Sequence, residues 1–139
     1  MNIGFQRPTD LALFALRILS ERTRPISGAD LADAVGTTIT YLPQVMSPLV
    51  RAGWVASNRG PGGGYKLAPE AERVSVRAVI DATEGSIVTG RCVLRDAPCP
   101  GSEECPVHSV WVEARSVLID GLDRIPAVQF RQSPGGGRR

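Results

Sequence analysis

The sequence predicts a mainly α fold with a small β-hairpin, organised as a winged helix-turn-helix with a long C-terminal dimerisation helix. Three observations lead to this prediction. Two short amphipathic segments are joined by a tight turn that contains glycine, and a glycine-rich hairpin follows them directly. An apolar stripe then recurs near the end of the chain, beyond a loop that holds every cysteine. The 139 residues suit one domain with a modest core.

The first helix is predicted from apolar residues at helical spacing. Thr9 is the expected N-cap, and the helix should end near Thr23 because Pro25 restricts the residue before it. The apolar stripe consists of Leu11, Phe14, Ala15, Ile18 and Leu19.

Two further helices form the expected helix-turn-helix. Ser27 and Asp30 resemble a capping box that opens the first of them, and Gly36 closes it. Thr37 or Thr38 should cap the second, whose apolar side carries Leu42, Val45, Met46, Leu49 and Val50.

The segment after this helix predicts a wing. Pro48 should kink the helix or bend its last turn, and Gly53 is the expected residue after its end. Residues 54–57 are typical of a strand, 59–64 of a glycine-rich turn and 65–67 of the returning strand.

The DNA-binding domain is expected to span residues 1–85, and its last element is a short helix at 74–82. Three further parts follow it. Residues 86–106 lack periodicity and form the expected cysteine loop. A dimerisation helix is expected within 107–126, because its apolar stripe needs a surface and a second copy can supply one. Residues 127–139 are expected to form a disordered tail.

The three cysteines carry the chemistry that is easiest to interpret. Cys92, Cys99 and Cys105 lie within 14 residues of an otherwise cysteine-free chain. Structural zinc generally uses closely spaced cysteine pairs, and none exists here. Wide spacing in a proline-stiffened loop favours a larger object with thiolate ligands, an iron–sulfur cluster. Three thiolates require a fourth ligand, and the two candidates are His108 and Asp10, the latter donated by a partner subunit.

A second group of residues indicates double-stranded DNA as a partner. The start of a recognition helix lies against base edges and phosphates, and an arginine at a wing can enter the minor groove. The candidate DNA-binding residues are Thr38, Thr40, Tyr41, Gln44, Arg51, Arg59, Gly62 and Gly63.

Composition and motifs argue against several other classes of protein. A nucleotide phosphate loop is excluded because no Gly-Lys-Ser/Thr ending follows the glycines. The chain has no catalytic base or second cofactor signature, so we expect neither an enzyme nor an electron carrier. No apolar stretch is long enough for a membrane span and no signal peptide is evident, so a cytoplasmic location is expected. The net charge of +2 decides nothing.

With these residues in place, the chain resembles the winged-helix iron–sulfur transcriptional regulators that include IscR and NsrR. The resemblance covers nearly the whole chain. It is carried by Thr-Asp-Leu-Ala-Leu at 9–13, by Tyr41-Leu42 with Gln44, by Arg59-Gly-Pro-Gly-Gly-Gly-Tyr65, and by Cys105-Pro-Val-His108-Ser-Val-Trp111.

The resemblance implies a homodimer, formed through the long helix, that binds an imperfect promoter palindrome, usually as a repressor. IscR-like members pair three cysteines with the histidine matching His108 around a 2Fe–2S cluster. Some NsrR-like members instead use the aspartate matching Asp10, from the other subunit, around a 4Fe–4S cluster. This chain has both residues, and its first cysteine gap is one residue longer than in IscR. Pro43 replaces a family glutamate that helps to select DNA sites, so a different target sequence is expected.

Two functional hypotheses follow. The leading one is a dimeric regulator whose promoter binding is controlled by an iron–sulfur cluster that senses redox state, nitric oxide, or iron and cluster status. The alternative is a winged-helix regulator whose cysteine loop holds zinc or no cluster and which acts through thiol oxidation or a protein partner.

Overall fold

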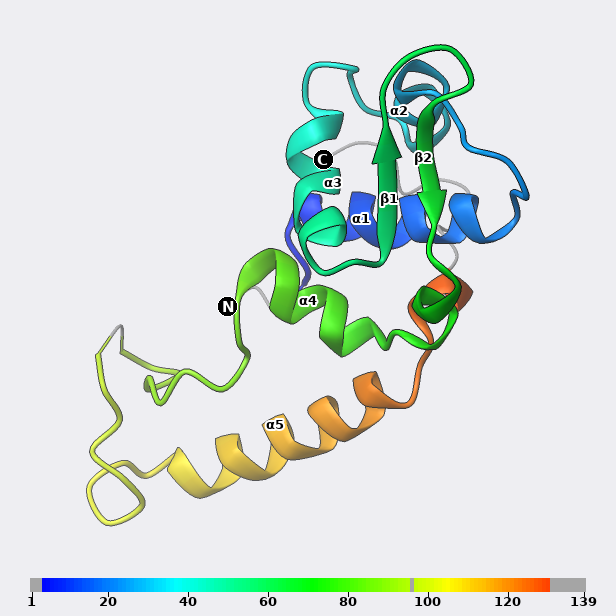
Figure 1. Ribbon diagram of the computed structural model, residues 1–139. Helices are drawn as coiled ribbons and strands as arrows, with labels where there is room; N and C mark the ends of the chain where they lie inside the picture. The colour runs from blue at the N-terminus through cyan, green and yellow to red at the C-terminus, as the bar shows by residue number, and fades with distance from the viewer. Residues whose placement is uncertain (1–3, 96, 131–139) are drawn as a thin grey trace.

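The computed structural model describes residues 4–95 and 97–130, which form the mainly α fold with one small hairpin that the sequence predicts (Figure 1). The elements in chain order are α1 (Arg7–Ser20), α2 (Gly28–Val35), α3 (Leu42–Arg51), β1 (Val55–Asn58), β2 (Gly64–Leu67), the 3-10 helix η1 (Pro69–Arg73), α4 (Val76–Glu84), α5 (His108–Asp123) and the 3-10 helix η2 (Ala127–Gln129).

Helix α1 lies at the centre of the core. It packs against α2, α3, α4, β2 and η2. Because neighbours cover α1 on several sides, most of its faces are apolar. Leu13, Leu16 and Leu19 are fully buried within it.

The start of α1 differs from the prediction. The helix begins at Arg7 with Gln6 as its N-cap, so Thr9 lies inside the first turn and does not cap it. Thr9 is fully buried, and its hydroxyl lies 2.6 Å from that of Thr83. The Glu84 carboxylate accepts hydrogen bonds from the Thr9 hydroxyl and, at 2.8 Å, from the backbone N–H of Gln6. A carboxylate from the end of α4 therefore caps α1, a favourable position for negative charge.

The predicted caps are confirmed for α2 but not for α3, whose N-cap is Tyr41 without a side-chain hydrogen bond. The Ser27 hydroxyl accepts from the Asp30 N–H at 3.1 Å, and Gly36 closes α2 with a φ of 77°. The Thr38 hydroxyl accepts from the Tyr41 N–H at 3.1 Å, so Thr38 caps a turn over residues 39–41. Because this turn precedes the helix proper, α3 begins only at Leu42.

The hairpin matches its predicted strands to within one residue. Strands β1 and β2 are antiparallel, with Val55 opposite Leu67 and Asn58 opposite Gly64. Ile26, from the α1–α2 connection, extends this sheet by pairing with Tyr65 through two backbone hydrogen bonds of 2.8 and 3.0 Å.

The segment after α5 is ordered, which corrects the expectation that the tail begins at residue 127. Ala127 is fully buried, and its N–H donates to the carbonyl of Val74 at 2.7 Å. The Arg17 guanidinium donates to the carbonyl of Val128, which fixes η2 against α1. Residues 131–139, the rest of the predicted tail, lie outside the described residues.

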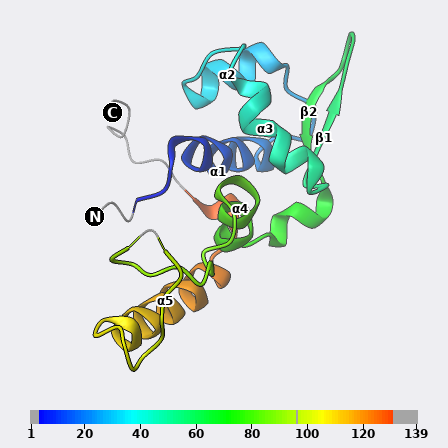
Figure 2. The same ribbon diagram turned by 90° about the vertical axis from the view of Figure 1, so that its left-hand side faces the viewer.

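Most residues predicted to contact DNA and the cysteines predicted to bind metal lie at opposite ends of the molecule (Figure 1). The hairpin tip and the α2–α3 connection lie at one end, at the top of Figure 1, whereas the cysteine loop and α5 lie at the other. The quarter turn in Figure 2 preserves this separation. Among the described residues, no helix is long and apolar enough to cross a membrane.

Candidate metal centre and nucleic-acid interface

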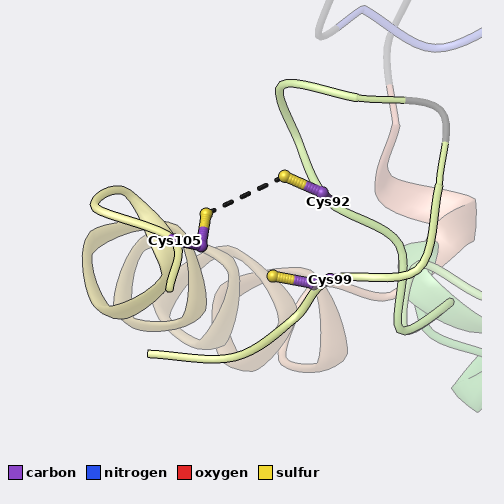
Figure 3. A group of neighbouring side chains, drawn as sticks. All are labelled: Cys92, Cys99 and Cys105. Carbon is purple, nitrogen blue, oxygen red and sulfur yellow. Dashed lines mark hydrogen bonds between the residues drawn. The ribbon is translucent and has the colours of Figure 1, made fainter. Parts of the chain in front are cut away.

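The three cysteines converge in the loop between α4 and α5 (Figure 3). Their sulfur atoms all lie within 4.8 Å of one another, and those of Cys92 and Cys105 are 3.9 Å apart. Cys92 and Cys105 are buried, Cys99 is half-buried, and all three are free thiols. The grouping anticipated from their spacing is therefore present.

Backbone hydrogen bonds, rather than helix or strand, give this loop its shape. The N–H of Cys92 donates to the carbonyl of Ala97 at 2.9 Å, and that of Cys99 donates to Gly90 at 3.0 Å. A similar bond joins Cys105 to Gly101. These hydrogen bonds fix the backbone at each cysteine in turns of the loop, and the three side chains meet where the turns converge.

The environment of the two buried thiols differs. The N–H of Leu94 lowers the pKa of the Cys92 thiol below its ordinary value, and together with weaker hydrogen bonds from Cys105, the N–H of Arg95 and Cys99 it outweighs the opposing effect of burial. The N–H of Val107 lowers the pKa of Cys105 in the same way. Burial and the sulfur atoms of Cys92 and Cys99 outweigh that bond, so the pKa of Cys105 is raised. Cys92 is thus the better stabilised thiolate, the form that binds metal.

Of the two candidate fourth ligands, only His108 lies beside the cysteines of its own chain. It is the first residue of α5, and its Nδ1 lies 3.2 Å from the sulfur of Cys99. Asp10 lies in the first turn of α1 and is not part of the grouped metal-ligating residues in the described chain. A role for Asp10 therefore requires a second copy.

The donor set fits thiolate-bound metal. Two thiolates on one tetrahedral ion, with bonds of about 2.3 Å, lie about 3.8 Å apart, which is close to the separation of Cys92 and Cys105. The four side chains form two adjacent pairs, Cys92 with Cys105 and Cys99 with His108. Two pairs suit the two irons of a 2Fe–2S cluster, in which imidazole can replace thiolate. The 4.8 Å grouping of the sulfurs also suits one ion.

Most candidate DNA-binding residues are exposed, and those of the α2–α3 connection and the hairpin tip lie at the end of the molecule opposite the cysteine loop (Figure 1). Thr38, Thr40, Gln44, Arg51, Arg59 and Gly62 are exposed. Tyr41 and Gly63 are half-buried, and Tyr41 packs against the core. At Gly63 a Cβ would lie 2.5 Å from the carbonyl oxygen of Asn58, so this glycine is required by the turn itself.

One exposed residue of this face was not among the sequence candidates. The Ile39 side chain is 61% exposed and lies between Thr38 and Thr40. Its spacing of three residues from Leu42 and seven from Met46 continues the apolar stripe and predicts burial, and it is exposed because α3 begins only at Leu42.

Comparison with known proteins shows what this architecture resembles. Residues 5–127 match the Rrf2 family, described as iron-dependent transcriptional regulators. The HTH-type transcriptional regulators IscR of Vibrio campbellii and Vibrio atlanticus are 36% and 38% identical over 107 residues, 77% of the chain. The chain spans only 63% and 61% of the length of these two curated relatives.

Solved structures share the fold. IscR of T. potens has a TM-score of 0.68 at 26% identity, with 96% of each chain covered. CymR, the global cysteine regulator of B. subtilis, has a TM-score of 0.73 at 24% identity and covers 94% of this chain and 100% of its own. At that identity the likeness to CymR concerns the fold alone.

Proposed function

The chain belongs to the Rrf2 family of iron-dependent transcriptional regulators, and from this we propose that it is a homodimeric DNA-binding repressor whose promoter binding is controlled by an iron–sulfur cluster. The single observation that carries the proposal is the convergence of Cys92, Cys99 and Cys105 at the end of the molecule opposite the hairpin. No enzymatic activity is proposed, since the relatives are transcriptional regulators.

We assign the ligands as Cys92, Cys99, Cys105 and His108, all from one subunit. Support comes from the two adjacent pairs, which would give each iron of a 2Fe–2S cluster two protein ligands. Such a cluster supplies a centre that reacts with oxidants and nitric oxide.

The ligands would connect the loop to the dimerisation helix. Cys105 lies just before α5, and His108 begins it. At the other end of the loop, Glu84 is hydrogen-bonded to α1. With its thiols engaged, the loop would hold α5 in one orientation relative to the DNA-binding domain, and their release would remove this constraint.

The outer face of α5 supports the dimer. Leu122 is the only residue of this helix that is buried in the single chain. Val110 and Val117 are 68% and 70% exposed, and Ala114 and Leu118 are exposed beside them on the same helical face. An apolar stripe of this kind is buried when two copies of the helix pair.

Substituting Val117→Glu should convert the dimer to a monomer, because a carboxylate would be buried without a partner in the paired stripe. Sedimentation equilibrium and the affinity for a palindromic fragment measure the effect. Ser116→Glu is the matched control, since Ser116 lies on the opposite, polar side of α5 and should leave the dimer intact. A dimeric Val117→Glu protein would contradict this assignment of the interface.

His108→Ala should lower the affinity for the metal by about tenfold or more, because removing a residue that only hydrogen-bonds to a metal ligand already has an effect of this size. The visible spectrum should change as well, since an imidazole ligand is lost. Asp10→Ala is the matched variant and should leave spectrum and iron content unchanged. The opposite pattern would assign the fourth ligand to Asp10 of a second subunit.

A second candidate function is favoured by the sulfur separations. Three sulfurs within 4.8 Å, with His108 beside Cys99, also suit a single tetrahedral zinc ion. In that case the loop would be a structural site, and regulation would act through thiol oxidation or a protein partner.

Metal analysis of protein purified without oxygen separates the two functions. The cluster proposal expects iron and acid-labile sulfide in equal amounts, together with a brown colour that nitric oxide bleaches. Zinc without sulfide would replace the proposal with the second candidate.

A further inference from the structure

Ile39 is an exposed aliphatic residue at a position where the proposed DNA contacts begin. Its side chain is 61% exposed, and it is not among the residues that pack on the core. Within the fully described segment 28–51, it is the only large apolar residue more than half exposed. Among the residues that the structure describes, the other large apolar side chains that are more than half exposed lie on α5, where a second copy would bury them, or in the cysteine loop.

The turn that carries Ile39 is held by hydrogen bonds and by the packing of the residues that follow it. The carbonyl of Thr38 accepts from the N–H groups of Tyr41 and Leu42 at 3.2 and 3.0 Å, and the Thr38 hydroxyl accepts a further bond from Tyr41. Leu42 is buried and Tyr41 half-buried, which anchors the turn to the core. Ile39 therefore extends from a fixed backbone, and ordering it on a ligand costs little conformational entropy.

Its neighbours define the chemistry of the surface. Thr38 and Thr40 offer hydroxyl groups suited to phosphate oxygens, and Gln44, in the first turn of α3, can pair with adenine. An aliphatic group between such residues has one distinctive target in the major groove, the C5-methyl group of thymine.

We propose that Ile39 is a specificity-determining residue that contacts a thymine methyl group in each half-site of the DNA. This inference rests on the proposed DNA-binding function and adds one base to its recognition. With Gln44 directed at adenine, the bases that face the start of α3 should be A·T pairs.

The test removes only the methyl group. Wild-type protein first selects its site from a pool of randomised duplexes, and each thymine of the selected site is then replaced by uracil. Burial of one methyl group is worth about fourfold in an equilibrium constant. One symmetry-related pair of thymines should therefore lower affinity about fourfold per half-site and about 15-fold when both are replaced.

The Ile39→Ala variant identifies the partner of that methyl group. It should bind the thymine site as weakly as wild-type protein binds the uracil site, and uracil should cost it nothing further. Ile39 is exposed, so the substitution should leave folding unchanged, which thermal unfolding checks. Val50→Ala, which alters an exposed apolar residue near the other end of α3, is the control and should retain the wild-type uracil profile.

The outcomes distinguish the two claims. If the selected site binds well but no thymine matters, or Ile39→Ala keeps full sensitivity to uracil, the assignment of Ile39 is wrong and the DNA-binding function stands. If wild-type protein selects no sequence, with or without bound metal, the proposed function fails and the role of Ile39 fails with it.

Discussion

Cys105→Ser should leave the protein without iron and without iron-dependent control of DNA binding. Cys105 is buried, and its sulfur lies 3.9 Å from that of Cys92. Cys105 also begins the short connection that leads into α5. A serine hydroxyl remains protonated near neutral pH, so the substitution removes the charge and softness that iron requires. Iron content and acid-labile sulfide should fall to background.

The DNA-binding consequence separates regulation from folding. Cys105→Ser protein should bind the selected promoter fragment with the affinity of metal-free wild-type protein and should not respond to iron, sulfide or nitric oxide. Ser102→Ala, which alters an exposed residue of the same loop, should keep the wild-type response. A Cys105→Ser protein that retains a full complement of iron would show that this thiol is not a ligand.

Gly64→Ala should destabilise the DNA-binding domain by about 3 kcal/mol or more. Gly64 has a φ of 131°, which side chains rarely adopt, and an added Cβ would overlap the carbonyl oxygen of Ile26 and lie 2.7 Å from its carbon. Both opposing atoms belong to backbone that pairs with Tyr65, so they cannot move aside without breaking that pairing. The melting temperature should fall by roughly 10 °C or more.

A neighbouring glycine separates the clash from the strain of a positive φ. Gly62 has a φ of 74°, and an added Cβ there would meet nothing within 4 Å. Gly62→Ala should therefore cost only about 1 kcal/mol, seen as a shift of a few degrees in the same thermal unfolding measurement. Equal losses in the two variants would refute the close approach of Ile26 as the reason for Gly64.

Features specified by neighbouring residues could be predicted from the sequence. The Ser27 cap, the left-handed Gly36 and the hairpin each depend on residues only a few positions apart. The grouping of the cysteines follows from the same local logic, because a short loop with prolines cannot separate them far.

Features that depend on distant residues were missed. Thr9 looked like a cap, but its partners are Thr83 and Glu84 on α4, and only the folded core brings them together. The ordered turn at 127–130 has the same origin, since its sequence is unremarkable until Ala127 meets the core and Arg17 reaches Val128. Local patterns contain no information about such partners.

The candidate site was predicted in part for the same reason. His108 lies near Cys105 in sequence, and the structure brings it to Cys99. Asp10 lies in α1, outside the group of ligands in its own chain, so any metal partner it has belongs to a second subunit and leaves no trace in local spacing. Ile39 was overlooked because its spacing from Leu42 and Met46 predicts a buried residue, whereas the structure exposes it in the turn before α3.

Control of DNA binding by the cysteine centre is tested most directly by the affinity for one promoter fragment, measured without oxygen at fixed salt. The measurement compares wild-type protein before and after its metal is removed. Coupling between a ligand and a distant site usually amounts to 5- to 150-fold, and salt must be held constant because phosphate contacts respond strongly to it. We predict that loaded and metal-free dimers differ in Kd by about tenfold or more. Equal dissociation constants for the two forms would contradict control of DNA binding by the cysteine centre.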